Sequence, residues 1–350
     1  MYRIMMDSAL FFDPRVDGYP LGNPKLIREA NKIGTLTFTI YPPHPAYGEI
    51  KMLTTVFSVY KDGNLIYQGR PAYSKRTFRN GIEYKCEELT AVMNDFQFRP
   101  VTFQGGTDQF FSRVISSANN YSGRIGFNPG DALNIASMDL KTDYTGHWEA
   151  LQKYLVFPYG GYIIPRYENS MITLDYLSEE SLPESSQMIT FGENMKDMFL
   201  EMDSQDTYSG IIPLGGIPSG ETEKVNIKSV NDGMDVVYHA EAVDLYGPRE
   251  VVKEWKDVLN PGELKELGMA WLRENAIKFR QTVQISAVDL HNADFSIESF
   301  EYLHWIRAVS ARHSLENRYV LAREEVPLDR PTGTVLTLGT TRRTYSESIM

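Results

Sequence analysis

Cysteine is almost absent from this sequence, in which Cys86 is the single cysteine among 350 residues. One cysteine cannot form a disulfide within the chain, and zinc sites built from four cysteines are excluded. The chain therefore has no covalent cross-link of its own, and its composition suits assembly in a reducing cytoplasm.

Long apolar runs are missing as well. No segment approaches the roughly 20 apolar residues that a membrane-spanning helix requires. Near the N-terminus the apolar stretch at residues 9–12 is shorter than the core of a secretory signal. We therefore expect no membrane-spanning segment and no signal peptide.

Positive charge is in deficit, since 35 Lys and Arg residues face 46 Asp and Glu residues and the formal net charge is −11. Binding to nucleic acid or to anionic membranes requires the opposite excess, so neither is expected. The acids are concentrated at residues 178–206, where eight of them accompany one base, Lys196. A solvated outer face is the ordinary explanation of such a stretch.

What is present is apolar and aromatic material: hydrophobic residues make up 42% of the chain, which excludes a disordered protein. In the first hundred residues, the strict alternation at 35–40 predicts a half-buried strand. The turn residues at 61–64 and at 80–81 each separate apolar runs and predict two hairpins. Cys86 lies in the strand after the turn at 80–81, at a position where the alternation places the side chain in the core.

In the middle of the chain, the spacing of apolar residues changes from that of strands to that of helices. Apolar residues at helical spacing follow Thr107, and a second helix is expected over 147–155, before two short strands at 162–166 and 171–176. Farther on, we expect a hairpin joining 225–230 to 235–242. Asn260 and Pro261 then predict a capped helix over 261–278, and strands resume from Thr282 to Leu338.

These patterns predict an α+β, β-rich fold with two β-rich ends and a mixed middle. The expected divisions are an N-terminal β domain, a small α+β domain, an acidic connecting segment, a C-terminal β domain and a tail. In that order they cover residues 1–100, 101–178, 179–210, 211–340 and 341–350.

Candidate catalytic groups do not assemble into a known motif. Cys86 lies in mid-strand and is expected to be a core residue rather than a nucleophile. The densest potential ligand cluster is Asp289, His291 and Asp294, which we expect to be a solvated strand end. The histidines form neither His-Glu-x-x-His nor His-x-His; they are His44, His147, His239, His291, His304 and His313.

Other chemistry is equally weakly marked. No Gly-x-Ser-x-Gly elbow occurs, and the 46 acids leave a carboxylate pair for glycan hydrolysis open. Gly105 and Gly106 precede a helix without the lysine of a phosphate loop, which favours a simple capped loop. Four aromatic residues near prolines suit either interface packing or a sugar site; they are Phe12, Tyr19, Tyr41 and Tyr47. We assign no catalytic, cofactor-binding or metal-binding residue and expect no cofactor.

Several segments nevertheless resemble one family. They are "NKIGTLTFTI", "VFSVYKDGNLIYQGR" and "NGIEYKCEEL" near the N-terminus, "QMITFGENMKDMFLEMDSQDTYSGIIPLG" in the middle, and "ISAVDLHNAD" and "VLTLG" near the C-terminus. In order and spacing they resemble the phage tail hub group, also called prophage endopeptidase tail proteins, which is similar in fold to the baseplate hub of contractile-tailed phages. The resemblance covers about residues 1–340.

The resemblance implies a homotrimer in which a β-barrel-like domain from each end of the chain alternates around a ring. Three chains then contribute six similar domains, and the ring is pseudo-sixfold. It implies a place at the virion tail tip, after synthesis in the host bacterial cytoplasm. The implied partners are copies of the chain, distal tail or tube proteins and the tape measure. DNA would pass through the ring without specific binding, and the acids at 178–206 are candidates for a repelling wall.

Three alternatives remain open for the role of the chain. One is a tail-associated cell-wall endopeptidase or glycosidase, although the family's lytic activity generally lies in an extra domain, for which the residues after Leu338 leave no room. Whether such a domain was removed stays open. The second is a module that binds host glycans, and the third is the same fold in a bacterial contractile injection device.

Overall fold

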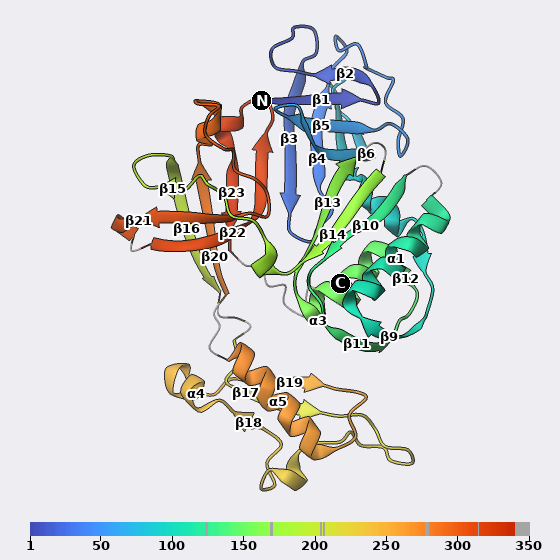
Figure 1. The fold of residues 1–350 in the computed structure, drawn as a ribbon, viewed down its shortest axis with the longest axis vertical. Coiled ribbons are helices and arrows are strands. Elements are labelled where there is room, and N and C mark those ends of the chain that lie inside the picture. The colour runs from blue at the N-terminus through green and yellow to red at the C-terminus, as the bar shows by residue number, and fades with distance from the viewer. Residues whose placement is uncertain are drawn as a thin grey trace. The chain divides into compact units, whose positions relative to one another are not determined.

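The computed structural model describes residues 1–122, 125–168, 171–203, 205, 207–276, 280–313 and 315–339 (Figure 1). The chain divides into two compact units. The main unit comprises Met1–Leu200 and Thr282–Met350, and the second unit comprises Glu201–Gln281. The domain boundaries that we draw from the sequence remain a prediction.

The N-terminal part of the main unit is a run of antiparallel strands. They are β1 (Tyr2–Met6), β2 (Ala9–Phe12), β3 (Leu21–Glu29), β4 (Thr35–Ile40), β5 (Phe57–Lys61), β6 (Asn64–Arg76) and β7 (Ile82–Glu88). Both hairpins predicted from the sequence are confirmed, because β5 pairs with β6 and β6 pairs with β7. Asp62 and Gly63 have positive φ, as the first of these turns requires. Strand β6 is continuous from Asn64 to Arg76, so one strand takes part in both hairpins.

The alternation in β4 has the expected effect on burial. Leu36, Phe38 and Ile40 are buried, while the threonines between them are half-buried. The ring of Phe38 packs edge-on against those of Phe11 and Phe57, at 5.0 and 5.1 Å between centroids. Aromatic pairs of this geometry stabilise a core beyond the area that they bury.

The C-terminal strands join the same sheet. They are β15 (Ile189–Thr190), β16 (Met195–Asp203), β20 (Arg280–Ala287), β21 (Trp305–Ser310), β22 (Leu315–Pro327) and β23 (Val335–Leu338). The strand order is β16-β20-β23-β22-β3-β4-β7-β6-β5-β1-β2, with β21 against β22 and β15 against β21. Within the described residues this order is an open path. The β-rich character predicted from the sequence is therefore confirmed, whereas the two barrel-like domains remain a prediction.

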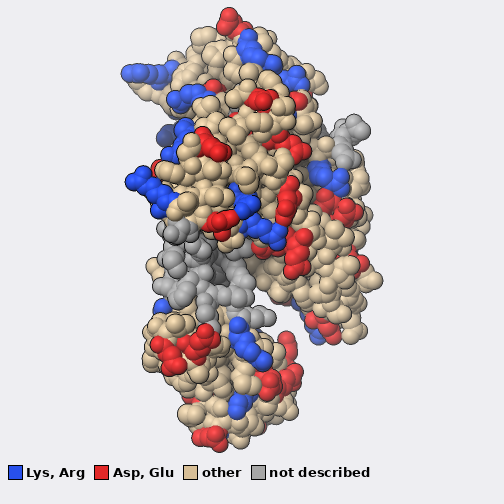
Figure 2. All heavy atoms as spheres, turned by 60° about the vertical axis from the view of Figure 1, so that its left-hand side comes forward, with Lys and Arg blue, Asp and Glu red and all other residues tan. Residues whose placement is uncertain are grey.

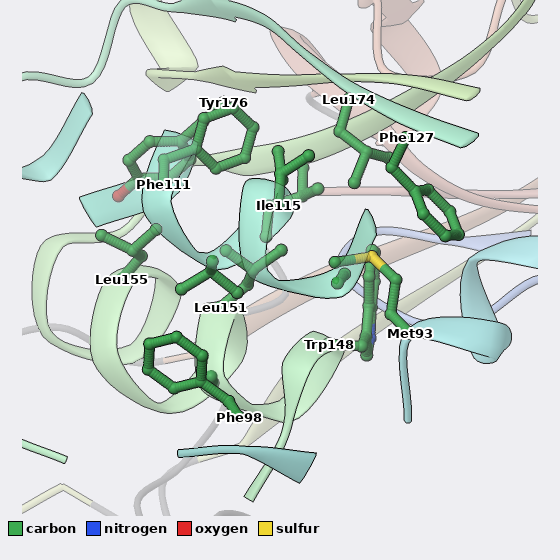
Figure 3. Packing of buried hydrophobic residues seen from close by; sticks show 14 of the residues in the cluster. Met93, Phe98, Phe111, Ile115, Phe127, Trp148, Leu151, Leu155, Leu174 and Tyr176 are labelled. Atoms are coloured by element: carbon green, nitrogen blue, oxygen red, sulfur yellow. The ribbon is translucent and has the colours of Figure 1, made fainter. Parts of the chain in front are cut away.

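The middle region packs one long helix and a second, irregular helix against a small sheet. Its helical segments are α1 (Thr107–Ser122), α2 (His147–Leu151), the π-helix η2 (Gln152–Val156) and α3 (Phe157–Tyr159). Its strands form a three-stranded sheet of β10 (Gly126–Ala132), β14 (Met171–Leu177) and β13 (Tyr162–Glu168), and two separate pairs, β9 (Thr102–Gly106) with β11 (Ser137–Lys141) and β8 (Gln97–Phe98) with β12 (Thr145–Gly146). Figure 3 shows Phe111 and Ile115 of α1 packing against Leu151, Leu155 and residues of the small sheet. The mixture of helices and strands predicted for this region is confirmed, whereas a separate domain at 101–178 remains a prediction.

The second unit contains β17 (Gly210–Leu214), β18 (Val237–Tyr238), β19 (Glu250–Glu254), α4 (Ala240–Tyr246) and α5 (Pro261–Asn275). The capped helix is confirmed, since the Asn260 side chain accepts hydrogen bonds from the backbone of Gly262 and Glu263. The hairpin predicted at 225–242 is wrong. The short strand β18 pairs with β17 instead, and the His239 side chain accepts a hydrogen bond from the Ala242 backbone and caps α4, so a helix begins at Ala240.

Short 3-10 turns complete the elements: η1 (Leu89–Asn94), η3 (Glu179–Ser181), η4 (Lys228–Val230), η5 (Leu290–Asn292), η6 (Ala311–His313) and η7 (Pro331–Gly333). Among the described residues, no helix combines the length and apolar character needed to cross a membrane.

Candidate functional site

The two ends of the sequence meet at the pairing of β3 with β22. This antiparallel register runs from Arg323 opposite Glu29 to Pro327 opposite Lys25. Leu26 and Val326 face each other in the register and are both buried. Hydrogen bonds and apolar contacts therefore make one continuous sheet of the two terminal regions. We call this pairing and the polar contacts around it the junction.

A buried ion pair lies at the centre of the junction. Arg28 Nε donates a hydrogen bond to Glu324 Oε1 at 2.7 Å, and the side chains are 14% and 6% exposed. The guanidinium also stacks on the ring of Tyr302, 4.9 Å from its centroid. Burial lowers the pKa of Arg28, but Glu324, together with Tyr302 and Glu301, raises it by more, so the net shift is upward and Arg28 stays charged.

Lys61 makes a second polar contact across the junction. Its ammonium donates to the carbonyl of Phe300 at 2.8 Å and lies 3.8 Å from Asp289 Oδ2 and 3.7 Å from Glu301 Oε1. The Lys61 side chain is 11% exposed. Because a buried ammonium requires such partners, β5 is fixed to the loop that precedes β21.

Glu88 links the N-terminal sheet to the middle region. Its carboxyl group accepts hydrogen bonds from the hydroxyl of Tyr167 at 2.5 Å, the Thr90 hydroxyl at 3.0 Å and the Gly34 backbone at 3.3 Å. Burial raises the pKa of Glu88 above its usual value, and these hydrogen bonds only partly oppose that rise.

No sequence motif marks the charged residues of the junction, but one signal in the sequence could have indicated them. Arg28 shares strand parity with the buried Leu26, and Glu324 shares parity with the buried Val326. A charged residue in the inward position of an alternating strand is costly without a partner. Two such positions at opposite ends of the chain suggest a pair, although sequence alone does not show which groups meet.

Cys86 is fully buried, as the strand alternation predicts. Burial raises the pKa of its thiol far above the usual value, so the reactive thiolate is disfavoured. In the sheet it lies opposite Leu36 on one side and Pro71 on the other. This environment is that of a core residue rather than of a nucleophile.

The cluster at Asp289, His291 and Asp294 does not converge. Asp289 accepts hydrogen bonds from Gln187, Ser299 and backbone groups, and its Oδ2 faces Lys61. His291 Nδ1 contacts the Ile297 carbonyl, while Asp294 binds Ser296. Each group is occupied in shaping the loop. Over the described ranges, no three His, Cys, Asp or Glu side chains are arranged to hold a metal.

The remaining histidines are scattered through the fold. His44 and His147 are buried, which lowers the pKa of each imidazole. His44 contacts the Phe11 carbonyl, and His147 contacts the carbonyls of Met93 and Phe96. His239 caps α4, as described above. The last two make local contacts near β21 and are His304, with the Tyr302 carbonyl, and His313, with Ser310.

The glycine loop and the aromatic group are likewise explained by local structure. Gly105 and Gly106 end strand β9, and the Gly106 amide donates to the Gln109 side chain. Among the four aromatics, Phe12 is buried, the Tyr47 hydroxyl donates to the Asn80 carbonyl, and Tyr41 is 42% exposed. The Tyr19 ring packs on His44 at 5.9 Å between centroids.

One hollow of about 370 Å³ lies beside α1 in the middle region. Its lining consists of Phe98, Arg99, Val101, Arg113, Ser116, Ser117 and Asn120. These residues include no carboxylate and no thiol, so the hollow offers no acid–base pair. On the face drawn in Figure 2, acidic and basic side chains are interspersed rather than gathered into areas of one sign.

A family model described as "Prophage endopeptidase tail" matches residues 183–349. No curated protein sequence matches the chain. A crystal structure of a prophage tail protein from Listeria monocytogenes is 10% identical and has a TM-score of 0.58, with 99% of this chain and 97% of that chain covered. The 43 kDa tail protein of prophage MuSo2 from Shewanella oneidensis is 10% identical and has a TM-score of 0.62, with 96% of each chain covered.

A tail protein from Neisseria meningitidis has a TM-score of 0.60 at 13% identity, over 97% of each chain. The fold is thus that of phage tail proteins. The resemblance to the prophage tail family that the sequence predicts is confirmed.

Proposed function

We propose that this chain is the hub of a phage tail tip: a homotrimer that joins the tail tube to the tip and surrounds the channel through which DNA leaves. The observation that supports this role is the junction. Because β3 and β22 pair, the two β-rich ends stand side by side in one sheet. Three copies would then offer six neighbouring β-rich regions to a sixfold tube, which is the symmetry match that a hub requires.

In this role the partners are other copies of the chain and the tail proteins above and below it, at the tip of the virion. DNA would pass without specific binding, and the net charge of −11 supports this, because an acidic wall repels phosphates. The function is structural and rests on interface burial. A hub interface of this kind should bury more than roughly 2,000 Å².

We also propose that the chain is not an enzyme. Cys86 is buried, the histidines lie apart and the cluster around Asp289 is engaged in hydrogen bonds. Incubation with cell-wall fragments tests this directly. Release of peptides or reducing sugar that a single point substitution abolishes would contradict the structural role, and no release is expected.

The trimer is tested by light scattering on the purified full chain over a concentration series. A mass three times that of the chain is expected. A single-chain mass at every concentration would contradict self-assembly. Decoration of isolated tails with labelled protein then distinguishes a hub, which binds one end, from a module that binds glycans, which would also bind wall polysaccharide in a saturable manner.

A second setting for the same role is a bacterial contractile device. An Escherichia coli protein, described as a component of the type VI secretion system with structural similarity to T4 phage tail proteins, has a TM-score of 0.50 at 8% identity, over 98% of this chain and 77% of that one. Purification of intact particles discriminates between the two settings. The phage hub predicts the chain in DNA-containing virions, whereas the secretion device predicts it in particles without DNA.

A further inference from the structure

In the outer half of the β6–β7 hairpin, β6 extends beyond its neighbour β5, whereas β7 stays paired with β4 as far as Ile82. The register of β5 with β6 ends at Phe57 opposite Gly69, whereas β6 continues to Arg76. From Ala72 onward, one edge of β6 pairs with β7 and, among the described residues, no strand pairs with the other edge. Residues 72–80 are all exposed. We call residues 72–85 the arm.

The arm is basic and carries exposed aromatic rings. The arm contains one acid, Glu83, and four bases, which are Lys75, Arg76, Arg79 and Lys85. None of these bases forms an ion pair within the described residues. Phe78, at the tip, is 103% exposed, and Tyr73 is 53% exposed. Lysines commonly protect an unpaired edge strand, but a fully exposed phenylalanine does not serve that purpose. Rings and unpaired bases together indicate a binding surface for an acidic and apolar partner.

A surface of the opposite character lies at the other end of the strand order. Strand β16 is the last strand there, and β15 lies at the outer side of β21. Met188 directly precedes β15 and Phe191 directly follows it, and these residues are 46% and 45% exposed. Glu193 and Asp197 are exposed and have no basic partner within the described residues, and the one base, Lys196, donates to the Thr332 carbonyl. We call residues 188–197 the acidic edge.

The arm and the acidic edge cannot meet within one chain. Strands β20, β23, β22, β3 and β4 separate β16 from β7 in the sheet, and Figure 1 shows β15 and β6 toward opposite sides of the main unit. Two complementary surfaces at opposite sides of one subunit produce a head-to-tail contact between copies, and a ring results when the rotation closes.

We propose that the arm of one copy docks on the acidic edge of a second copy, with Phe78 against Met188 and Phe191, and with Lys75 and Arg79 facing Glu193 and Asp197. This proposal rests on the proposed trimer and specifies the contact that builds it. The free edge of β6 adds backbone hydrogen-bonding groups that a neighbouring edge strand can satisfy.

Charge reversal in the full chain tests the proposal by light scattering over a concentration series. The arm variant K75E/R79E and the edge variant E193K/D197K should each associate more than about tenfold more weakly than the unaltered chain, because like charges then oppose each other. The combination of all four substitutions in one chain should restore the association. The variant R113E/K141E makes the same charge change on exposed positions of the middle region and should leave the mass unchanged.

Two other outcomes separate the hypotheses. If the unaltered chain forms a trimer and both reversal variants retain it, the arm contact is wrong and the trimer stands. If the unaltered chain has a single-chain mass throughout, both the trimer and the arm contact are wrong. Circular dichroism of each variant verifies folding, and F78S, which leaves all charges in place, should weaken the association without changing the spectrum.

Discussion

Arg28 and Glu324 are 296 residues apart in the sequence and form a buried ion pair, with Nε and Oε1 at 2.7 Å. The pair lies where β3 meets β22, so it contributes to holding the first and last parts of the chain in one sheet. A buried pair is costly to desolvate, and its removal has very different effects depending on whether one partner or both are replaced.

The substitution R28A should lower the free energy of unfolding by about 3 to 5 kcal/mol, because Glu324 is then buried without a counter-charge. The double variant R28M/E324M should recover much of that loss. Urea unfolding followed by circular dichroism measures both. As a control, R307A removes a pair with Glu316 whose side chains are 57% and 66% exposed, and the expected loss is below about 1 kcal/mol. Equal losses for R28A and R307A would contradict the assigned role.

Glu88 should make stability depend on pH. Burial raises its pKa above the usual 4.5 in the folded chain, so the folded state retains a proton that the unfolded state loses. Its contribution is therefore fully present below pH 4.5 and is lost as the pH rises through the raised value, at no more than about 1.4 kcal/mol per pH unit.

In the variant E88Q, the free energy of unfolding should not show this fall as the pH rises. Unfolding free energies of the two proteins, measured at intervals from pH 4.5 upward, should differ by an amount that changes with pH. Glu83 lies on the same strand with its side chain exposed, so E83Q should keep the pH dependence of the unaltered chain. A constant difference between E88Q and the unaltered chain would mean that Glu88 does not titrate differently on folding.

Much of the fold is predictable from the sequence where the signal is local. The alternation at 35–40, the Asp62–Gly63 turn and the Asn260 cap each depend on a few neighbouring residues, and the structure contains all three. The prediction of a hairpin at 225–242 was wrong, and the interaction that decides the structure there is also local. The cap made by His239 also acts locally, but histidine is not among the usual capping residues.

The candidate site was harder to predict because its contacts are not local. Lys61 meets the carbonyl of Phe300, 239 positions away, and nothing near either residue indicates the other. The Asp289 cluster shows the opposite error, because residues that are close in sequence suggested a site that the structure does not form. Three potential ligands close in sequence turn away from one another because each completes a separate hydrogen bond in its loop.

Cys86 should resist modification in the folded chain. Its side chain is fully buried and its thiol pKa is raised, so thiolate is scarce and a reagent has no access. Reaction with Ellman's reagent at neutral pH should be slow in buffer and complete in denaturant. Because this is the only cysteine, the signal reports one position. Rapid reaction of the native protein would show that the sheet opens at β7.

Phe111 and Phe78 are the same residue type at opposite extremes of burial, with relative solvent accessibilities of 0% and 103% for the whole residue. F111A removes a ring from the core shown in Figure 3 and should cost about 3 to 5 kcal/mol in the free energy of unfolding. F78A removes a ring that has no core contact, and stability should stay within about 0.5 kcal/mol. If F78A instead destabilises the isolated chain, the ring packs within its own subunit, and its exposure would no longer favour a contact with a second copy. Urea unfolding below the concentration at which the chain associates distinguishes these outcomes, because a contact between copies contributes nothing there.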